Sequence, residues 1–288
     1  MTNKKTAFIT GAAMGMGALM ARTLSDRGWE VYAGVVPGAD TSELLPYDNI
    51  TAIEQDVTND ESVKKSSQEL AKLLDGRGLD LLINNAGIAN IGIGVIEGAD
   101  IERGHFMFEV NTWGPMRVCQ SFLPFIRQNK GRVINFASGA VKANPPASGV
   151  YNMSKHAVIG MTLTMRHELA ALGVQVTSIE PGAVKTHMTK DPFESTQNIW
   201  KEVSPEMKDV YFPHLGATTT EVLPQSIIDT GNDPVDVVNQ VLGLLAIKKW
   251  KPSYMVGKDV KLMPLLHKIL PALTFESIIQ GAFKIPKK

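Results

Sequence analysis

Short runs of apolar and β-branched residues alternate along the chain with longer segments in which apolar residues recur at helical spacing. The short runs predict six strands in the first two thirds of the chain, at residues 6–10, 30–36, 50–53, 79–83, 132–136 and 174–179. The longer segments predict helices that begin near Gly15, Asp60, His105 and Tyr151. Because such alternation builds βαβ units, we expect an α/β fold in which helices flank a doubly wound parallel sheet.

The pattern changes after the sixth predicted strand. Residues 181–233 hold several prolines, threonines and scattered aromatic residues without a clear period, which predicts a long loop. A loop of that length inside a compact domain is usually functional, so we expect a lid at about 183–232.

The C-terminal part of the chain returns to regular patterns. A helix is predicted near 234–246 and a strand at 253–256, and an apolar segment follows at 262–283. We therefore expect one domain at 1–260, which includes the lid, and a C-terminal apolar extension at 261–288. The extension could cover a pocket, join subunits or touch a membrane surface, and the sequence leaves these three roles open.

Charge and composition narrow the classes of function. The 29 Lys and Arg residues balance the 29 Asp and Glu residues, so no overall field attracts nucleic acid, an anionic membrane or a polyanionic partner. A neutral small molecule fits better as the substrate. The single cysteine, Cys119, excludes an internal disulfide and a cysteine metal site, and His156, His167 and His187 lack metal-ligand spacing. We expect no metal.

The same features bear on location. One cysteine in 288 residues suits a reducing compartment, and the first residues lack the apolar region of a signal peptide. No uncharged apolar run reaches the ~18 to 20 residues that cross a bilayer, because the longest candidate, 81–96, is broken by glycines and asparagines. We expect a cytoplasmic protein without an integral membrane segment.

A glycine-rich turn follows the first predicted strand and leads into a helix. Glycines let the backbone approach a pyrophosphate, and the start of a helix supplies unpaired N–H donors. The spacing Gly-x-x-x-Gly-x-Gly departs from the commoner Gly-x-Gly-x-x-Gly, and a turn without a ligand is the alternative. The expected dinucleotide contacts are Gly11, Ala13, Met14, Gly15, Met16 and Gly17.

The end of the second predicted strand should distinguish the two nicotinamide dinucleotides. An acidic side chain there accepts from the ribose 2′-hydroxyl of NAD, and an arginine favours the 2′-phosphate of NADP. Neither occurs in the strand, Asp40 follows a few residues later, and no Lys or Arg lies between Glu30 and Tyr47. NAD is therefore favoured, and NADP stays possible.

Asp56 follows the third predicted strand. Its carboxylate could accept from the adenine amino group or cap the following helix, and these two interpretations are about equally supported. The segment from Thr58 to Glu61 has the form of a capping box, which predicts the start of that helix.

Tyr151 and Lys155 are four residues apart on a predicted helix, which puts them on one face. A neighbouring ammonium should lower the pKa of the phenol from its usual value near ~10, so that Tyr151 becomes a usable acid and base. Ser138 comes just after the strand at 132–136, at an edge where α/β sheets bind ligands. A tyrosine and lysine at this spacing often pair by chance, so the interpretation depends on the combination with Ser138.

These motifs, in this order, resemble those of the classical short-chain dehydrogenase/reductase family over nearly the whole chain. The segments at 10–17 and 84–87 are similar to its cofactor turn and its Asn-Asn-Ala-Gly motif. The glycine spacing does not follow the Thr-Gly-x-x-Gly-x-x-Gly of the extended relatives, which include epimerases and dehydratases. The resemblance implies a Rossmann-like fold and further cofactor contacts at Asp56, Val57, Asn85, Ala86, Gly87, Tyr151, Lys155, Pro181, Gly182, Val184 and Thr186.

The resemblance also implies a catalytic role for four residues. Tyr151 would exchange a proton with the substrate oxygen, and Ser138 would position that oxygen. Lys155 would hold the nicotinamide ribose and lower the pKa of the tyrosine, and Asn111 would maintain a water relay. The expected reaction moves a hydride between the nicotinamide and a secondary alcohol or ketone. From the residues alone, a structural role is the better interpretation for the two asparagines of the Asn-Asn-Ala-Gly motif.

Local strings are similar to the branch that holds retinol, hydroxysteroid and 3-hydroxybutyrate dehydrogenases, and the expected lid is rich in apolar side chains. An apolar substrate is therefore expected, although the same side chains could simply pack the lid: Met188, Phe193, Trp200, Met207, Tyr211 and Phe212. By resemblance, the helices at 105–128 and 151–172 would join subunits into a homodimer or homotetramer. Two other functions remain: a non-catalytic dinucleotide sensor or scaffold, and a lyase or epimerase with a tightly held cofactor.

Overall fold

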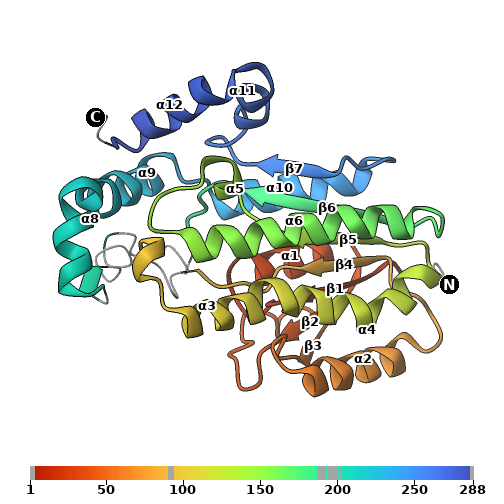
Figure 1. Ribbon diagram of the computed structural model, residues 1–288. Coiled ribbons are helices and arrows are strands. Elements are labelled where there is room, and N and C mark those ends of the chain that lie inside the picture. The colour runs from red at the N-terminus through yellow and green to blue at the C-terminus, as the bar shows by residue number, and fades with distance from the viewer. Residues whose placement is uncertain (1–3, 90–93, 187–192, 194–199, 202, 286–288) are drawn as a thin grey trace.

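The computed structural model describes residues 4–89, 94–186, 193, 200–201 and 203–285. Its centre is a parallel sheet with the strand order β3-β2-β1-β4-β5-β6-β7 (Figure 1). The chain reverses its direction of travel across the sheet between β1 and β4, and the carboxyl ends of the strands at such a reversal are where open α/β sheets bind ligands. The expected doubly wound, Rossmann-like sheet is confirmed. The strands are β1 Thr6–Thr10, β2 Glu30–Val35, β3 Ile50–Glu54, β4 Leu81–Asn84, β5 Arg132–Phe136, β6 Gln175–Pro181 and β7 Ser253–Val256.

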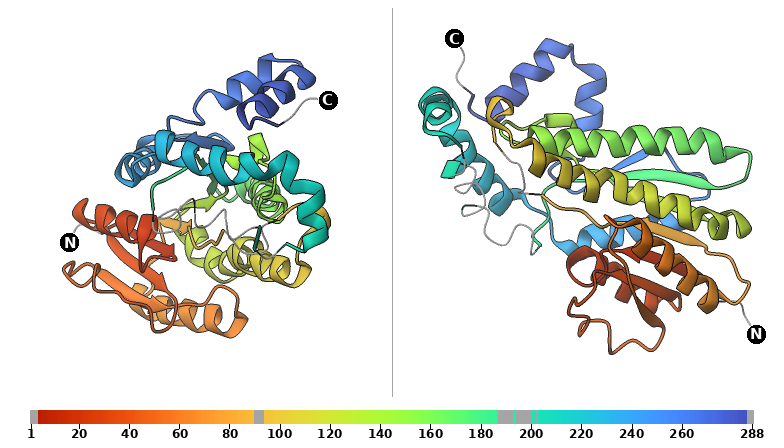
Figure 2. Two further views of the ribbon diagram at one scale, coloured as in Figure 1. Left: turned by 90° about the vertical axis from the view of Figure 1, so that its left-hand side faces the viewer. Right: turned by 60° about the horizontal axis from the view of Figure 1, so that its bottom comes forward.

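Helices cover both faces of the sheet because the side chains of each strand alternate between the faces. In β1, Ala7 and Ile9 pack into the core on one face, whereas Phe8 packs into the core on the other, with its ring centroid 4.5 Å from that of Phe122. The first face is covered by α1 Gly15–Asp26 and α10 Pro234–Gly243, and the second by α2 Asp60–Leu74, α4 Gly114–Gln128 and α6 Gly149–Ala170 (Figure 2).

One predicted helix start is wrong by about a turn. The helix expected from His105 begins at Ile101, because Asp100 accepts a hydrogen bond from the backbone N–H of Arg103 and caps it. The helical stretch then continues through a π-helical turn into α4. This stretch consists of α3 Ile101–Phe108, η2 Glu109–Trp113 and α4. Three further short helices lie elsewhere in the described chain: η1 Ile96–Gly98, α5 Ala140–Ala143 and η5 Leu244–Ala246.

The predicted capping box at the start of α2 is also wrong. Asn59, not Thr58, caps the helix by accepting from the backbone N–H of Ser62 at 2.9 Å. The hydroxyl of Thr58 donates instead to Asp56 at 2.7 Å. Asp56 therefore holds the turn before the helix, and the interpretation of Asp56 as the helix cap is wrong too.

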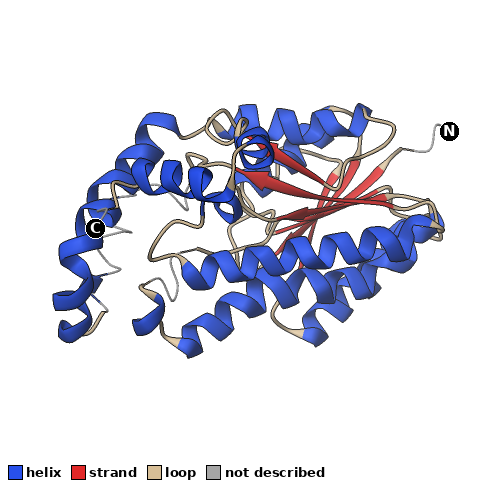
Figure 3. Cartoon of the chain, turned by 45° about the horizontal axis from the view of Figure 1, so that its top comes forward, coloured by secondary structure: helices blue, strands red, loops and turns tan. Residues whose placement is uncertain are grey.

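The segment expected to be a loop is mainly helical where it is described. It contains α8 Pro205–Ala217, the π-helical η4 Thr218–Val222 and α9 Leu223–Thr230, which lie beyond the edge at which the strands end (Figures 1 and 3). Ser204 caps α8 by accepting from Met207. The helical period is weak because α8 buries only Gly216 completely, and the apolar side chains on its packed face, Met207, Tyr211 and Leu215, are only partly buried.

The C-terminal extension forms two further helices, α11 Met263–Ile269 and α12 Ala272–Ala282. Neither helix contains a buried residue, and Leu273 is 80% exposed. The hydroxyl of Thr218 donates to the carbonyl of Phe283 at 2.7 Å, which ties the end of the extension to η4. Among the helices of the described residues, none combines the length and the apolar character that a bilayer crossing needs.

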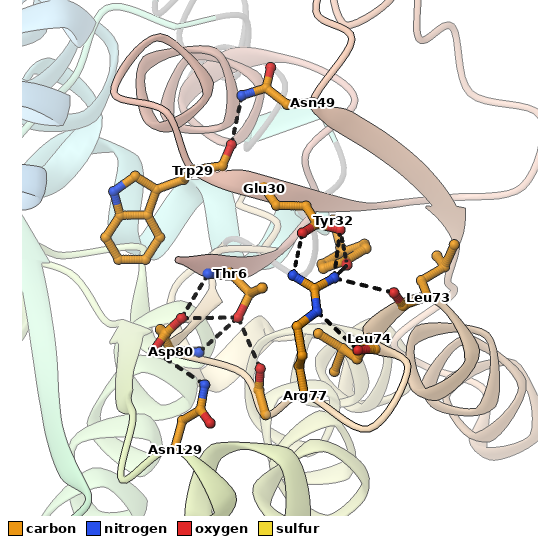
Figure 4. Close-up of polar contacts among 11 residues, drawn as sticks. Thr6, Trp29, Glu30, Tyr32, Asn49, Leu73, Leu74, Arg77, Asp80 and Asn129 are labelled. Atoms are coloured by element: carbon orange, nitrogen blue, oxygen red, sulfur yellow. Dashed lines mark hydrogen bonds and ion pairs between the residues drawn. The ribbon is translucent and has the colours of Figure 1, made fainter. Parts of the chain in front are cut away.

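Polar side chains fasten the amino-terminal edge of the sheet (Figure 4). Arg77 donates to both carboxylate oxygens of Glu30, at 2.6 and 3.0 Å, and the hydroxyl of Tyr32 donates to the same carboxylate at 2.5 Å. On the neighbouring strand β1, the backbone N–H of Thr6 donates to the carboxylate of Asp80, which precedes β4, at 2.8 Å. The hydrogen bond from Arg77 is the main cause that holds the pKa of Glu30 below its usual value of 4.5.

Replacing Arg77 tests this fastening. We expect Arg77→Met to lower the free energy of unfolding by about 1 kcal/mol at neutral pH, because a partly exposed bidentate ion pair is lost. The pKa of Glu30 is lowered in the folded state, so the contribution is present above 4.5 and disappears as the pH falls through the folded-state value. Urea unfolding curves from pH 7 down to about pH 3.5 measure the difference.

Lys72→Met is the matched control, because it removes an exposed cation from the last turn of α2. A loss of stability in Arg77→Met that is the same at every pH, or equal to that of the control, contradicts the assignment.

Candidate active site

The glycine turn after β1 requires glycine at three positions. Gly11 and Gly15 have φ values of +62° and +60°, which other residues rarely adopt. A Cβ on Gly17 would lie 2.2 Å from the carbonyl oxygen of Gly11, and one on Gly11 would lie 2.9 Å from the Cα of Ala86. The backbone of the turn is therefore packed tightly against α1 and against the segment after β4.

The start of α1 fits a dinucleotide pyrophosphate. The residue at its N-cap position, Met14, makes no side-chain capping hydrogen bond, and the first turn contains no acidic residue. Met14 is 56% exposed, and the side of Gly15 on which a Cβ would stand meets no described atom within 4 Å. No side-chain cap occupies the start of the helix, so its first N–H groups and the helix dipole suit an anion there.

The Asn-Asn-Ala-Gly motif braces the turn. Asn85 donates through its side chain to the carbonyl oxygens of Thr10 and Gly11, at 3.0 and 3.2 Å. The hydroxyl of Thr10 accepts from the backbone N–H groups of Asn85 and Ala86. Asn84 donates to Asn135 of the neighbouring strand at 2.8 Å. These contacts agree with a structural role for both asparagines.

The acidic residues near the expected adenosine site are held by local contacts. Asp40 is exposed and accepts from the backbone N–H of Ser42 at 2.9 Å, and hydrogen bonds with Ser42 hold the pKa of Asp40 below its usual range. Asp56 accepts from the backbone N–H and the hydroxyl of Thr58. The side chain of Val57 is buried against Gly114 of α4, so its backbone is the part that can meet a ligand.

Ser138, Tyr151 and Lys155 converge at the carboxyl end of β5. Ser138 follows this strand, and Tyr151 lies in the first turn of α6 because that helix begins at Gly149. Ser138 shares a side-chain hydrogen bond with Tyr151. The ammonium of Lys155 lies 5.8 Å from the centroid of the tyrosine ring and donates to the carbonyl oxygen of Phe136 at 3.2 Å. The sequence predicted this convergence.

Burial acts on both titratable groups, and for Tyr151 it reverses the expected direction. Burial raises the pKa of Tyr151, and the hydrogen bond with Ser138 lowers it by less. Burial also lowers the pKa of Lys155 to about 8. The proximity of the lysine was expected to lower the tyrosine pKa, but in the protein alone the removal of the phenol from water outweighs other effects.

The buried ammonium of Lys155 fits the ribose of a nicotinamide dinucleotide. Lys155 is 5% exposed, and its bond to Phe136 is the one hydrogen bond that its Nζ makes among the described residues. An ammonium has three donors, so hydroxyl oxygens are suitable further partners. A Cβ on Gly87 would lie 3.2 Å from this Nζ, so glycine keeps the approach to the lysine clear.

Asn111 lies on the π-helical turn η2 and is almost completely buried. Its amide accepts from the backbone N–H of Ile88 at 2.8 Å and donates to the carbonyl of Ile88 at 2.9 Å and to the hydroxyl of Ser154 at 3.1 Å. Asn111 therefore connects the segment after β4 to helix α6, which carries Tyr151 and Lys155.

The segment from Pro181 to Thr186 follows β6 at the same edge. The backbone N–H of Gly182 donates to Val256 of β7 at 2.9 Å, and that of Ala183 donates to the carboxylate of Asp259 at 2.8 Å. Val184 forms a parallel bridge with Asn232. Sequence reasoning missed Asp259 and Asn232, because nothing in the local pattern near either residue indicates contact with a segment 49 to 76 positions away.

The apolar side chains of the expected lid lie mainly against one another. Trp200 is 5% exposed, donates from its indole to the hydroxyl of Thr219 at 2.7 Å, and has its ring 5.2 Å from that of Phe212. Met207 and Tyr211 pack against the same small cluster. Met188 lies outside the described residues. The arrangement favours the interpretation that these side chains pack the lid.

His156 contacts the carbonyl oxygen of Asn152, and His167 is exposed. His187 lies outside the described residues. No group of three or more His, Cys, Asp or Glu residues in the described part of the chain is arranged to hold a metal ion. Cys119 is buried as expected, and burial raises the pKa of its thiol to about 12.

Comparisons with known proteins agree with this geometry. The family model of the short chain dehydrogenases matches residues 5–197. The chain is 31% identical to mouse retinol dehydrogenase 7 over 96% of its own length and 87% of the relative's, and 33% identical to bovine dehydrogenase/reductase SDR family member 9 over 93% and 85%.

Solved structures share the fold. A short-chain dehydrogenase from Streptomyces avermitilis superposes with a TM-score of 0.75 at 22% identity, covering 97% of this chain and 99% of its own. One from Burkholderia cenocepacia, in complex with NADP, gives 0.73 at 24% identity and covers 99% of both chains. The chain therefore belongs to the short-chain dehydrogenase family and is a nicotinamide-dependent oxidoreductase that acts on alcohol or ketone substrates.

Proposed function

We propose that the protein interconverts an apolar secondary alcohol and its ketone, with Tyr151 as the acid and base. The observation that carries the proposal is the convergence of Ser138, Tyr151 and the buried Lys155 beside the glycine turn, at the carboxyl edge of the sheet. A nicotinamide dinucleotide held by the glycine turn and Lys155 would supply the hydride chemistry, as acceptor in oxidation and donor in reduction. The protein supplies position and proton transfer.

Each residue has a distinct part in this proposal. The hydroxyl of Ser138 holds the substrate oxygen, and the phenol of Tyr151 gives a proton to that oxygen in reduction and takes it back in oxidation. Lys155 donates to ribose hydroxyls and, as a cation, favours the deprotonated tyrosine. Asn111 fixes the backbone at Ile88 beside the lysine, and a water relay through Asn111 remains a prediction.

The remaining cofactor contacts follow from the turn and the strand ends. The N–H groups from Ala13 to Gly17 hold the pyrophosphate, Asp56 and Val57 meet the adenine, and the segment from Pro181 to Thr186 meets the nicotinamide. We propose NAD as the preferred cofactor, because no basic residue lies between Glu30 and Tyr47 to receive a 2′-phosphate.

The proposed substrate class rests on two supports. Relatives that match over most of the chain include mouse retinol dehydrogenase 7 and human retinol dehydrogenase 16. Helices α8 and α9, which carry both apolar and charged side chains, also lie beyond the carboxyl edge of the sheet, in the position of a lid. A retinoid, a steroid or another hydrophobic alcohol fits both.

We also propose a cytoplasmic homodimer or homotetramer. The outer faces of α4 and α6 expose apolar side chains, Met116 and Leu163 among them, which a partner subunit would cover. The single buried cysteine needs no oxidising compartment. The main domain at 1–260 is the dinucleotide-binding catalytic domain in this proposal, and residues 261–288 are an extension to it.

The first test replaces the proposed acid and base. We expect Tyr151→Phe to lower kcat on apolar secondary alcohols by roughly 10²-fold or more, because proton transfer loses its group, while the dissociation constant for NADH stays within about two-fold. Absorbance of the reduced nicotinamide, recorded with NAD and NADP in turn, measures turnover, and a fluorescence titration measures binding.

Tyr254→Phe is the matched control, because it removes a tyrosine hydroxyl on β7 that accepts from the backbone of Lys251 outside the site. Turnover of Tyr151→Phe at the rate of this control would overturn the mechanism. Saturable binding without turnover in the wild type would favour a sensor, and product formation without net change of the cofactor would favour a lyase or epimerase.

The second test uses the pKa of Lys155, which burial lowers to about 8 in the cofactor-free protein. Ribose hydroxyls bind best to the charged ammonium, so we expect the dissociation constant for NADH to rise roughly ten-fold between pH 7 and pH 9. Lys155→Met should bind NADH weakly and without this pH dependence. A wild-type dissociation constant that is flat across this range would contradict the role of the lysine.

The same shift predicts the pH dependence of stability without cofactor. The folded-state pKa of Lys155 lies below its usual value of 10.5, so the unfolded chain binds more protons between pH 8 and 10.5. The contribution of this residue to the free energy of unfolding therefore rises with pH across that window, and Lys155→Met lacks this rise. Urea unfolding at several pH values, for wild type and variant, measures the difference.

A further inference from the structure

A short turn after β7, Gly257–Val260, meets both segments that carry the proposed reaction; we call it the C-terminal turn. On one side, the side chain of Val260 covers Gly139, which follows the proposed catalytic Ser138: a Cβ on Gly139 would lie 2.8 Å from the Cγ1 of Val260. On the other side, Asp259 reaches the backbone after Gly182. The turn therefore lies between the serine loop and the proposed nicotinamide segment.

Asp259 joins three stretches of chain through two hydrogen bonds. Its Oδ2 accepts from the backbone N–H of Ala183 at 2.8 Å, and its Oδ1 accepts from the side-chain amide of Asn232 at 2.6 Å. Ala183 lies in the proposed nicotinamide segment, and Asn232 lies at the far end of the proposed lid. The carboxylate of Asp259 thus connects Ala183, where the chain leaves the core for the proposed lid, with Asn232, where the chain returns.

Asn232 also connects Ala183 with the C-terminal turn. It is 7% exposed, and its side-chain amide also donates to the carbonyl of Ala183 at 2.8 Å. Its side-chain oxygen accepts from the backbone N–H of Lys258 in the C-terminal turn at 2.7 Å. Both backbone polar groups of Ala183 are thereby held, one by Asp259 and the other by Asn232.

Two glycines provide the space for this arrangement. A Cβ on Gly182 would lie 2.0 Å from Oδ1 of Asp259, and one on Gly257 would lie 2.8 Å from the same oxygen. Gly257 also has a φ of +118°, a conformation that other residues rarely adopt. The carboxylate therefore fills a site that the backbone leaves open on both sides.

We propose that Asp259 is a positioning residue for the cofactor site: it holds the backbone at Gly182 and Ala183, and through Asn232 the return of the lid, in the conformation that receives the nicotinamide. This inference rests on the proposed contact between the segment from Pro181 to Thr186 and the cofactor. A carboxylate suits the task because it accepts both N–H donors at once. An amide side chain has one oxygen and would turn an N–H toward one of these donors.

The position of the C-terminal extension follows from the same contacts. Helix α11 begins at Met263, three residues after the C-terminal turn, and Val260 already contacts the serine loop. Asp259 therefore lies between the extension and Ala183, which is 76 positions earlier in the chain.

The test compares Asp259→Ala, and the near-isosteric Asp259→Asn in case the first variant folds poorly, with wild type. Without cofactor, we expect faster amide hydrogen exchange in the peptide that contains residues 181–186, because the donor at Ala183 loses its acceptor. We also expect the dissociation constant for NADH to rise on the order of ten-fold, the size of a lost hydrogen bond to a charged group.

Asp233→Ala is the matched control. Asp233 is adjacent to Asn232, and its carboxylate accepts from the backbone N–H of Val235 to cap α10, but among the described residues it makes no hydrogen bond to Ala183. This variant should lose stability while the exchange at 181–186 and the dissociation constant for NADH stay at wild-type values. A thermal melt of each variant separates loss of stability from loss of binding.

The outcomes distinguish this inference from the proposed function. Wild-type exchange at 181–186 in both Asp259 variants, or a dissociation constant for NADH equal to that of Asp233→Ala, overturns the positioning role. If wild-type protein binds NADH but turns over no alcohol, the proposed reaction fails while the exchange and binding measurements still decide the role of Asp259.

Discussion

A parallel sheet brings the carboxyl ends of all its strands to one edge, and the candidate site depends on this constraint. The glycine turn follows β1, Gly87 follows β4, Ser138 follows β5 and Pro181 ends β6. Since β1, β4, β5 and β6 are consecutive in the sheet, segments that are far apart in the sequence become neighbours without any long loop to carry them. Helix α6 then brings Tyr151 and Lys155 to the same edge, where Lys155 contacts the end of β5.

Burial of Lys155 is the main electrostatic feature of this edge. An ammonium that loses water and keeps one carbonyl partner has a lowered pKa, and the same burial raises the pKa of Tyr151. Both shifts are properties of the protein without its cofactor. The ammonium of Lys155 and the phenol of Tyr151 are thereby held at the place where a cofactor and a substrate would give them further polar partners. Asn111 fixes the neighbouring backbone at Ile88 in the protein without these ligands.

Close packing against three glycines holds the site together. Gly17 stands against the carbonyl of Gly11, Gly11 against Ala86, and Gly182 against Asp259, and each contact leaves no room for a Cβ. The first two connect the turn after β1 to α1 and to the end of β4. The third connects the end of β6 to the C-terminal turn, which shows that the last strand contributes to the site although it carries none of the proposed catalytic groups.

The sequence by itself determined the sheet, the glycine turn and the cluster of Ser138, Tyr151 and Lys155. The sheet and the turn have local signals, which are runs of β-branched residues and glycines between a strand and a helix. The cluster is indicated by a tyrosine four residues before a lysine in combination with a serine just after a strand. Tertiary structure decided the rest. Residues 205–230 are helical although α8 buries only Gly216 completely. The cap of α2 is Asn59, while the hydroxyl of Thr58 donates to Asp56. The pKa of Tyr151 is raised because burial outweighs the other effects on it. Asp259 meets Ala183 only in the folded chain, since a contact across 76 residues depends on the path of the whole backbone and leaves no local pattern to read.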